Sequence, residues 1–326
     1  MALEFQVKTT DKLQAAEVTA LTRLFEMVFG KPCPVDLFAR KFGRSCLGWS
    51  VHSLMFLDGE LIGAYSAIPV RYRFCGRTQV FAIGLDLMID PGHRGRAFQV
   101  NKRLGRMLYE ALAREGAAFV FCCVRDEIFQ FHKAISRWRA VGSVHYYAAP
   151  FRLPYLVGPA SGLARAGVRI WNRLSRQPSI GGDAEFEIEK VNDAGFAAWR
   201  YGIFPSNYTT VALPGGGSSL YATDLYYPIA GLPPDVRAGV LIDVFPLTKA
   251  HFDAAVLAVR RREPELTVLA YQGVLPFRAR DMLRIPAKYE RQAWTLAGRI
   301  LNPTQVDDRV FDMSRWNINL SNGDLV

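Results

Sequence analysis

A long apolar run followed directly by a basic turn and a helix constrains the fold more than any other stretch of this sequence. Residues 78–90 (TQVFAIGLDLMID) are typical of a buried strand, PGHRGR follows, and apolar residues then recur at helical spacing from about Ala97 to Arg114. The next run, AAFVFCCV at 117–124, predicts another strand. The order strand, turn, helix, strand favours an α/β protein whose sheet is covered by helices.

The turn itself has the chemistry of an anion site. The first turn of a helix has N–H groups without intrahelical partners and a partial positive charge, and arginine adds forked donors. We therefore expect a cradle for a diphosphate, the alternative being an ordinary solvated basic turn. In this cradle the charges come from His93, Arg94 and Arg96, and the N–H groups come from Gly95, Arg96, Ala97 and Phe98.

The other elements follow from periodicity and turn residues. In the first half we expect a strand at EFQVKTT, a helix from Thr10-Asp11 to Gly30, a helix from Val35 to Phe42, a hairpin turning at Asp58-Gly59, and a short helix over Ile128 to Trp138. In the second half we expect strands in FEIEKV, SSLYATDLYYPIAG, AGVLIDVFPL, ELTVLAYQGV, WTLAGRI and WNINL, with helices in NDAGFAAWRYGIF and from Lys249 to Arg262. IGLDLMIDP and GVLIDVFPL both place an acid before a short turn and a helix, which predicts an internal repeat.

The length of 326 residues favours two domains. We expect a first domain at 1–150, a linker helix at 151–184 and a second domain at 185–326. The linker has arginines on one side (Arg165, Arg169, Arg173, Arg176) and mostly apolar residues on the other (Leu163, Gly167, Ile170, Leu174). Such a helix either lies on an anionic membrane or packs against a neighbouring domain.

The net charge of +10 favours an anionic partner, which is a nucleic acid, an acidic membrane surface or a phosphorylated small molecule. The five cysteines show no CxxC spacing, so we expect free thiols in a reducing cytoplasm. The first residues, MALEFQVKTTDKL, do not have the pattern of a signal peptide, and no stretch approaches the ~20 apolar residues of a membrane span. The scattered histidines predict no metal site.

The stretch from Asp86 to Gly116, DLMIDPGHRGRAFQVNKRLGRMLYEALAREG, resembles the central motif of the GCN5-related N-acetyltransferase (GNAT) family. The resemblance implies two GNAT-like domains in tandem, each with a central mixed sheet flanked by helices, an α/β (mixed α+β) class. It also implies that the turn holds the pyrophosphate of acetyl-CoA or another acyl-CoA, while Leu87, Met88 and Ile89 pair with its pantetheine arm. The stretch departs from the family pattern at Ala97 and Gln99.

Transfer of an acyl group to an amine requires a free amine, an oxyanion donor and a proton for the leaving thiolate. Asp86 is the first candidate for the general base, because burial in an apolar strand raises the pKa of a carboxyl group; Asp126 and Glu127 compete with it. The alternative for Asp86 is a carboxylate that lies on the polar face of the strand or pairs with an arginine. The family often uses a tyrosine on the helix after the next strand, but DEIFQFHKAISRW has none, and His132, which shares a helix face with Ser136, is the candidate there. A structural histidine is its alternative.

The second half contains polar and aromatic residues able to bind a nucleotide, or alternatively to lie half-buried in strands: Arg200, Tyr201, Tyr208, Tyr226, Tyr227 and Trp316. Asp243 echoes Asp86 without a basic turn beside it, and we expect it to be structural or to orient the substrate. The tandem pattern is similar to N-acyltransferases of nucleotide-linked amino sugars, which implies such an acceptor. We expect a small-molecule substrate rather than a nucleic acid, and no membrane span. Alternatives are a tRNA-dependent aminoacyl transferase of cell-wall synthesis and a non-catalytic binding module with a degenerate GNAT fold.

Overall fold

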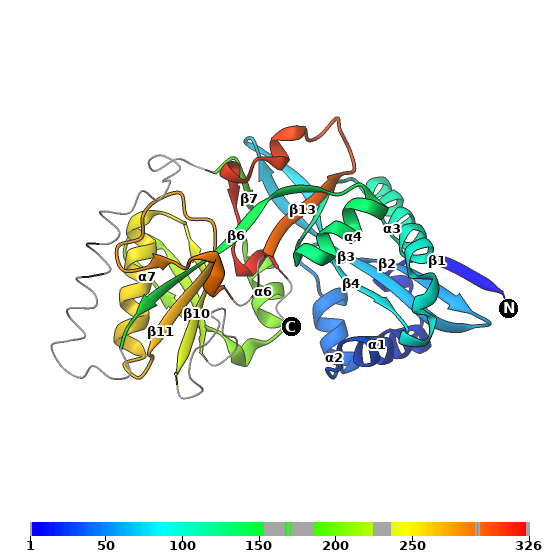
Figure 1. The fold of residues 1–326 in the computed structure, drawn as a ribbon, viewed down its shortest axis with the longest axis horizontal. Helices are drawn as coiled ribbons and strands as arrows, with labels where there is room; N and C mark the ends of the chain where they lie inside the picture. Colours follow the sequence, from blue (N-terminus) through cyan, green and yellow to red (C-terminus); the bar gives the residue numbers. More distant parts are fainter. Residues whose placement is uncertain are drawn as a thin grey trace. The chain divides into compact units, whose positions relative to one another are not determined.

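A computed structural model describes residues 2–152, 167, 170, 186–223, 236–290, 292 and 294–323 (Figure 1). The chain divides into two compact units: unit 1 comprises 1–142, 188–203 and 295–312, and unit 2 comprises 143–187, 204–294 and 313–326. The sequence-based division placed 188–203 and 295–312 in the second domain, whereas these segments pack in unit 1. Of the expected linker between 151 and 184, the described residues after Arg152 are the helical Gly167 and Ile170; its arginine stripe lies outside the described residues.

Unit 1 is built on a mixed sheet with the strand order β1-β2-β3-β4-β5-β13, and β7 pairs with the far end of β3. β4 and β5 run parallel, and the other pairings are antiparallel. Parallel neighbours require a crossover connection, which α3 supplies. The strands are β1 (Leu3–Thr9), β2 (Val51–Leu57), β3 (Glu60–Phe74), β4 (Arg77–Ile89), β5 (Ala117–Val124), β7 (Ile188–Lys190) and β13 (Trp294–Ile300).

The hairpin predicted at Asp58-Gly59 is confirmed. These two residues join β2 to β3, and both have positive φ angles, 49° and 89°. A two-residue turn of this kind needs positive φ at both positions and matches the twist of the strands that it connects.

Helices cover both faces of the unit 1 sheet, with α1 and α2 on one face and α3 and α4 on the other (Figure 1). α3 begins and ends at the predicted residues, and buries Val100, Leu104, Leu108 and Leu112 against the sheet. The predicted helix from Val35 to Phe42 is shorter, because α2 ends at Phe38 and continues as a π-helical turn over Ala39–Gly43. The helices are α1 (Ala15–Phe29), α2 (Val35–Phe38), α3 (Ala97–Arg114), α4 (Asp126–Ser136) and α6 (Ala194–Gly202).

Unit 2 has its own mixed sheet in the order β12-β6-β11-β10-β9-β8, with β10 and β11 parallel. α7 connects this parallel pair and packs Phe252, Ala255 and Val259 into the core. Its N-cap is Thr248, whose side chain accepts a hydrogen bond from the N–H of His251. The elements are β6 (Arg139–Pro150), β8 (Thr209–Ala212), β9 (Ser218–Thr223), β10 (Ala238–Phe245), α7 (Lys249–Arg262), β11 (Val268–Gly273), β12 (Leu283–Arg284) and β14 (Trp316–Asn317).

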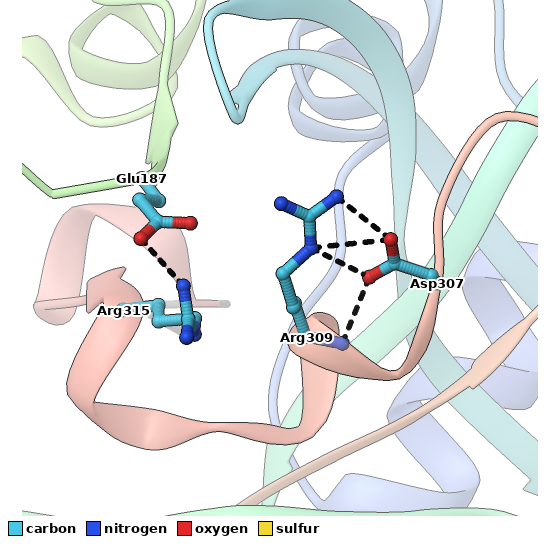
Figure 2. Close-up of polar contacts among 4 residues, drawn as sticks. All are labelled: Glu187, Asp307, Arg309 and Arg315. Carbon is cyan, nitrogen blue, oxygen red and sulfur yellow. Dashed lines mark hydrogen bonds and ion pairs between the residues drawn. The ribbon is translucent and has the colours of Figure 1, made fainter.

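Charged and aromatic contacts attach segments from late in the chain to each unit. In unit 1, Arg139 pairs with Asp308 at 2.6 Å, and the guanidinium of Arg309 is held by Asp307 and lies 5.4 Å from the centroid of the Phe74 ring. In unit 2, Arg315 pairs with Glu187 (Figure 2). Exposed pairs of this kind contribute at most about 1 kcal/mol each, so the buried strands rather than these pairs stabilise the segments.

The two units repeat the same strand–helix–strand arrangement, β4-α3-β5 in unit 1 and β10-α7-β11 in unit 2. In both, the first strand carries a bulge next to its aspartate: the register shifts between Ser66↔Leu85 and Ala64↔Met88 in unit 1, and between Leu241 and Asp243 in unit 2. The repeat predicted from the two aspartate-bearing strands therefore has a structural counterpart.

The predicted mixed α/β class, with sheets flanked by helices, is confirmed. Within the described ranges, no helix is long and apolar enough to cross a bilayer.

Candidate active site

The parallel strands β4 and β5 part before either of them ends. Their pairing runs from Val80↔Ala117 to Ile83↔Phe121, although β4 continues to Ile89 and β5 continues to Val124. Beyond Phe121, β5 keeps its other partner, since β13 pairs with it as far as Val124. Among the described strands, none pairs with β4 on the β5 side after Ile83, and backbone groups at such an opening can bind an extended ligand.

A bulge at Asp86 and Leu87 lies where the strands part. These two β4 residues face the single residue Tyr65 of β3. Asp86 has a φ of 51°, the left-handed conformation that residues other than glycine rarely adopt. Bulges redirect side chains and backbone groups, and they recur beside functional sites.

The side chain of Asp86 forms a buried ion pair. The ammonium of Lys41 lies 3.0 Å and 3.2 Å from its two carboxylate oxygens, and both side chains are 7% exposed. Lys41 is fixed in turn, because the indole N–H of Trp199 donates to its carbonyl oxygen at 2.9 Å. Asp86 is thus buried, as predicted. Its partner is a lysine, however, and the positive charge of this lysine favours the ionised form of the carboxylate.

The basic turn is more regular than expected. Residues Pro91–Arg96 form a 3-10 turn that runs directly into α3. The carboxylate of Asp90 accepts from the N–H of Gly92 at 2.7 Å and lies 3.5 Å from the ring of His93. His93, Arg94 and Gly95 are exposed, so charge and open backbone occur together at the predicted place.

A pocket of about 600 Å³ lies beside this turn. Gly95 and Gln99 line it together with β1 residues and three cations of α3 that the sequence argument did not single out. The guanidinium of Arg103 stacks on the Phe5 ring, 4.0 Å from its centroid. The lining residues are Leu3, Phe5, Gly95, Gln99, Val100, Lys102, Arg103 and Arg106.

His132 lies in a buried aromatic group on the α3 side of the sheet. Its ring stacks on Trp138 with centroids 4.6 Å apart, lies 6.0 Å from Tyr65, and is 4% exposed. Burial lowers the pKa of His132 to about 4, so the ring is neutral at pH 7. Its Nδ1 atom has no hydrogen-bond partner among the described residues, which is unusual for a buried polar atom.

The competing acids lie at the surface. Asp126 and Glu127 form the first turn of α4, directly after β5, and are exposed. Asp126 accepts a hydrogen bond from the hydroxyl of Thr295 at 2.7 Å. Carboxylates are favourable at a helix N-terminus, which gives both residues a structural reason to be there.

The residues predicted for the acceptor are divided between the two units. Arg200 and Tyr201 belong to α6 in unit 1, where Arg200 is 3% exposed, whereas Tyr208 and Trp316 belong to unit 2, where Trp316 is fully buried. Tyr201 and Tyr208 are half-buried. Tyr226 and Tyr227 lie outside the described residues. Burial of Trp316 gives this residue a packing role.

In unit 2, a segment from the end of the chain lies at the opening between β10 and β11 that corresponds to the opening between β4 and β5. β10 and β11 part after Leu241↔Tyr271, and the segment from Ile318 to Asn322 follows the end of β11, with Gly273 bridged to Asn319. The amide of Asn319 donates to the buried carboxylate of Asp243 at 2.8 Å. Asp243 is therefore tied to this segment.

Within the described part of the chain, no three His, Cys, Asp or Glu side chains gather in a way that could hold a metal ion.

The comparisons with known proteins identify the fold. No family model matches the chain, and no curated protein matches its sequence. A GCN5-related N-acetyltransferase from Anabaena variabilis is similar over 91% of this chain and 73% of its own, with 11% identity and a TM-score of 0.59. A probable N-acyltransferase from Enterococcus faecalis covers the same shares at 12% identity and a TM-score of 0.57. Eis1 from Mycobacterium abscessus is similar over 92% of this chain and 74% of its own, at 12% identity and a TM-score of 0.54. The chain therefore has the fold of the GCN5-related N-acetyltransferases.

Proposed function

We propose that this chain is an acyl-CoA-dependent N-acyltransferase. The observation that carries the proposal is the parting of β4 and β5 after Ile83 and Phe121, beside the bulge at Asp86-Leu87 and directly before a basic helix start. This arrangement offers open backbone to an extended thioester arm and positive charge to the phosphates at its other end.

The donor is held along its length by different groups. The backbone at Leu87, Met88 and Ile89 pairs with the pantetheine arm, and one of these N–H groups faces the oxyanion. Arg94 and the backbone at the start of α3 hold the pyrophosphate; the side chain of Arg96, also predicted there, lies outside the described residues. The pocket containing Phe5, Lys102, Arg103 and Arg106 takes the phosphate-bearing nucleotide end, because it combines an aromatic ring with three cations.

The amine nitrogen attacks the thioester carbon, the C–S bond breaks, and one proton moves from the amine to the leaving sulfur by way of a base and an acid. Asp86 positions the bulge through its pair with Lys41, which makes it a poor proton acceptor. Asp126 is the proposed base, directly after β5. His132 is the proposed donor to the sulfur: its ring is neutral at rest, with Nδ1 unsatisfied within the described structure, and it takes up the proton that the base removes from the amine and passes it to the thiolate.

The proposed acceptor is the amino group of a nucleotide-linked amino sugar. The net charge of +10 supports it, since donor and acceptor are both anionic. Within unit 1, which contains the donor site, Tyr201 remains the candidate for stacking on the acceptor, since it is half-buried.

Release of free thiol from acetyl-CoA tests this proposal. The protein is incubated with acetyl-CoA and UDP-linked amino sugars, and with the same nucleotides bearing unmodified sugars as controls. Thiol release that depends on the amino group supports the proposal. Binding of acetyl-CoA without turnover of any amine would favour a binding module.

A further inference from the structure

Tyr65 stands at the point where β4 and β5 part. It is the β3 residue opposite the bulge, and its side chain is 2% exposed on the face covered by α3. A Cβ atom added to Gly84 would lie 2.8 Å from the Tyr65 hydroxyl oxygen, so this hydroxyl lies directly against the backbone of Gly84. Gly84 is the first β4 residue after the last parallel pair, Ile83↔Phe121.

The phenol of Tyr65 is fixed in this position. Its hydroxyl shares a hydrogen bond with the hydroxyl of Tyr109 on α3, and the two rings meet edge to face with centroids 6.1 Å apart. The Tyr109 oxygen also accepts from the indole N–H of Trp138 at 3.0 Å. Burial raises the pKa of both tyrosines, which keeps them neutral. A side chain held by such a network does not move aside without leaving buried polar groups unpaired.

The position of Tyr65 limits the space that is open to the acyl group of the donor. A thioester held at Leu87–Ile89 directs its acyl chain toward the closed end of the parted strands, which lies at Ile83 and Phe121. Gly84 leaves room there, and the Tyr65 phenol occupies that room from the α3 side. Neighbouring Val120 closes it further, since its Cγ2 atom would lie 3.6 Å from the same added Cβ.

We propose that Tyr65 forms the floor of the acyl pocket and restricts the donor to short acyl groups such as acetyl. This inference rests on the proposed function and specifies its donor class. A chain of several additional methylenes would have to displace the phenol from its hydrogen bond with Tyr109, whereas an acetyl group ends before it.

Titration with acetyl-CoA, butyryl-CoA and octanoyl-CoA tests the proposal in the full chain and in two variants. We expect the natural chain to bind octanoyl-CoA at least about tenfold more weakly than acetyl-CoA, the discrimination that a few methylenes can give. Tyr65→Ala is expected to remove this difference, and Tyr65→Phe, which keeps the ring, to retain it. Thermal unfolding checks that both variants fold.

The outcomes separate this inference from the proposed function. Equal binding of acetyl-CoA and octanoyl-CoA by the natural chain overturns the role of Tyr65 even if Tyr65→Ala does not fold. An unchanged preference in a folded Tyr65→Ala overturns it as well, while the proposed function stands. Failure of the natural chain to bind acetyl-CoA, butyryl-CoA and free coenzyme A overturns both.

Discussion

The ammonium of Lys41 lies 3.0 Å from a carboxylate oxygen of Asp86, and this ion pair joins a π-helical turn to the bulge of β4 across 45 residues of sequence. The aspartate is held in the left-handed conformation at the point where β4 leaves β5. We interpret the pair as the element that fixes the shape of the donor site, because both charges are buried and each is the other's counterion.

Removal of one member of this pair should destabilise the fold strongly. We expect Lys41→Met to lower the free energy of unfolding by about 3–5 kcal/mol, because it leaves a buried carboxylate without its counterion. Urea denaturation measures this loss. The double variant Lys41→Met/Asp86→Leu should recover a large part of it, and a double variant no more stable than Lys41→Met alone would contradict the pairing.

Stability should fall in mild acid because of His132. Its pKa is lowered to about 4 in the folded chain, against an ordinary value of 6.5, so protonation below pH 6.5 favours the unfolded chain. Full stability is present above about pH 6.5 and is lost as the pH falls toward 4, with a slope of at most about 1.4 kcal/mol per pH unit for this residue.

His132→Phe keeps the ring stacked on Trp138 and should reduce that slope. Urea denaturation at several pH values between about 4.5 and 7 measures it. His52 and His145, whose pKa values burial lowers to about 3 and about 4, supply the slope that remains. An identical pH profile for the variant and the natural chain would show that His132 is not buried and neutral.

The pocket beside β1 should bind the 3′-phosphate of the donor. Arg103→Ala is expected to weaken binding of acetyl-CoA by about tenfold or more, the usual effect of losing one hydrogen bond to a charged group. The same variant should bind acetyl-dephospho-CoA, which lacks the 3′-phosphate, as well as the natural chain does. Equal losses for the two ligands would place the phosphate elsewhere.

The chain should bind one coenzyme, although two strand–helix–strand segments repeat. In unit 2 the segment from Ile318 to Asn322 already pairs with the backbone at the end of β11, through Gly273 and Val274. We expect a calorimetric stoichiometry of one acetyl-CoA per chain; two would contradict this interpretation. Asn319→Ala should lower stability by about 1–3 kcal/mol, because the buried carboxylate of Asp243 loses a donor.

Local features of the fold could be predicted from sequence because each has a short-range cause. α3 and α7 begin and end at the residues predicted from the sequence, and the turn at Asp58-Gly59 follows from its dipeptide. Contacts distant in sequence could not be predicted in this way. Nothing near Asp86 points to Lys41, and nothing in WNINL shows that Trp316 is buried.

The allocation of short strands to units was also beyond the sequence pattern. β7 and β13 come from the second half of the chain but pair with β3 and β5 of unit 1. A short apolar strand can pair with the free edge of any sheet, so its partner strand depends on the whole fold. The basic residues Lys102, Arg103 and Arg106 did carry a signal, since they follow the turn at helical spacing, but their pocket depends on β1.

Calorimetric titration with acetyl-CoA tests the central claim most directly. We expect the natural chain to bind with a Kd in the micromolar range, and Arg94→Glu to lose this binding because it reverses a charge at the start of α3. Arg23→Glu, an equal change of charge at an exposed position of α1, is the matched control and should bind normally. No binding to the natural chain, or equal binding to all three proteins, would contradict the assignment of the turn at Pro91–Arg96 to the coenzyme.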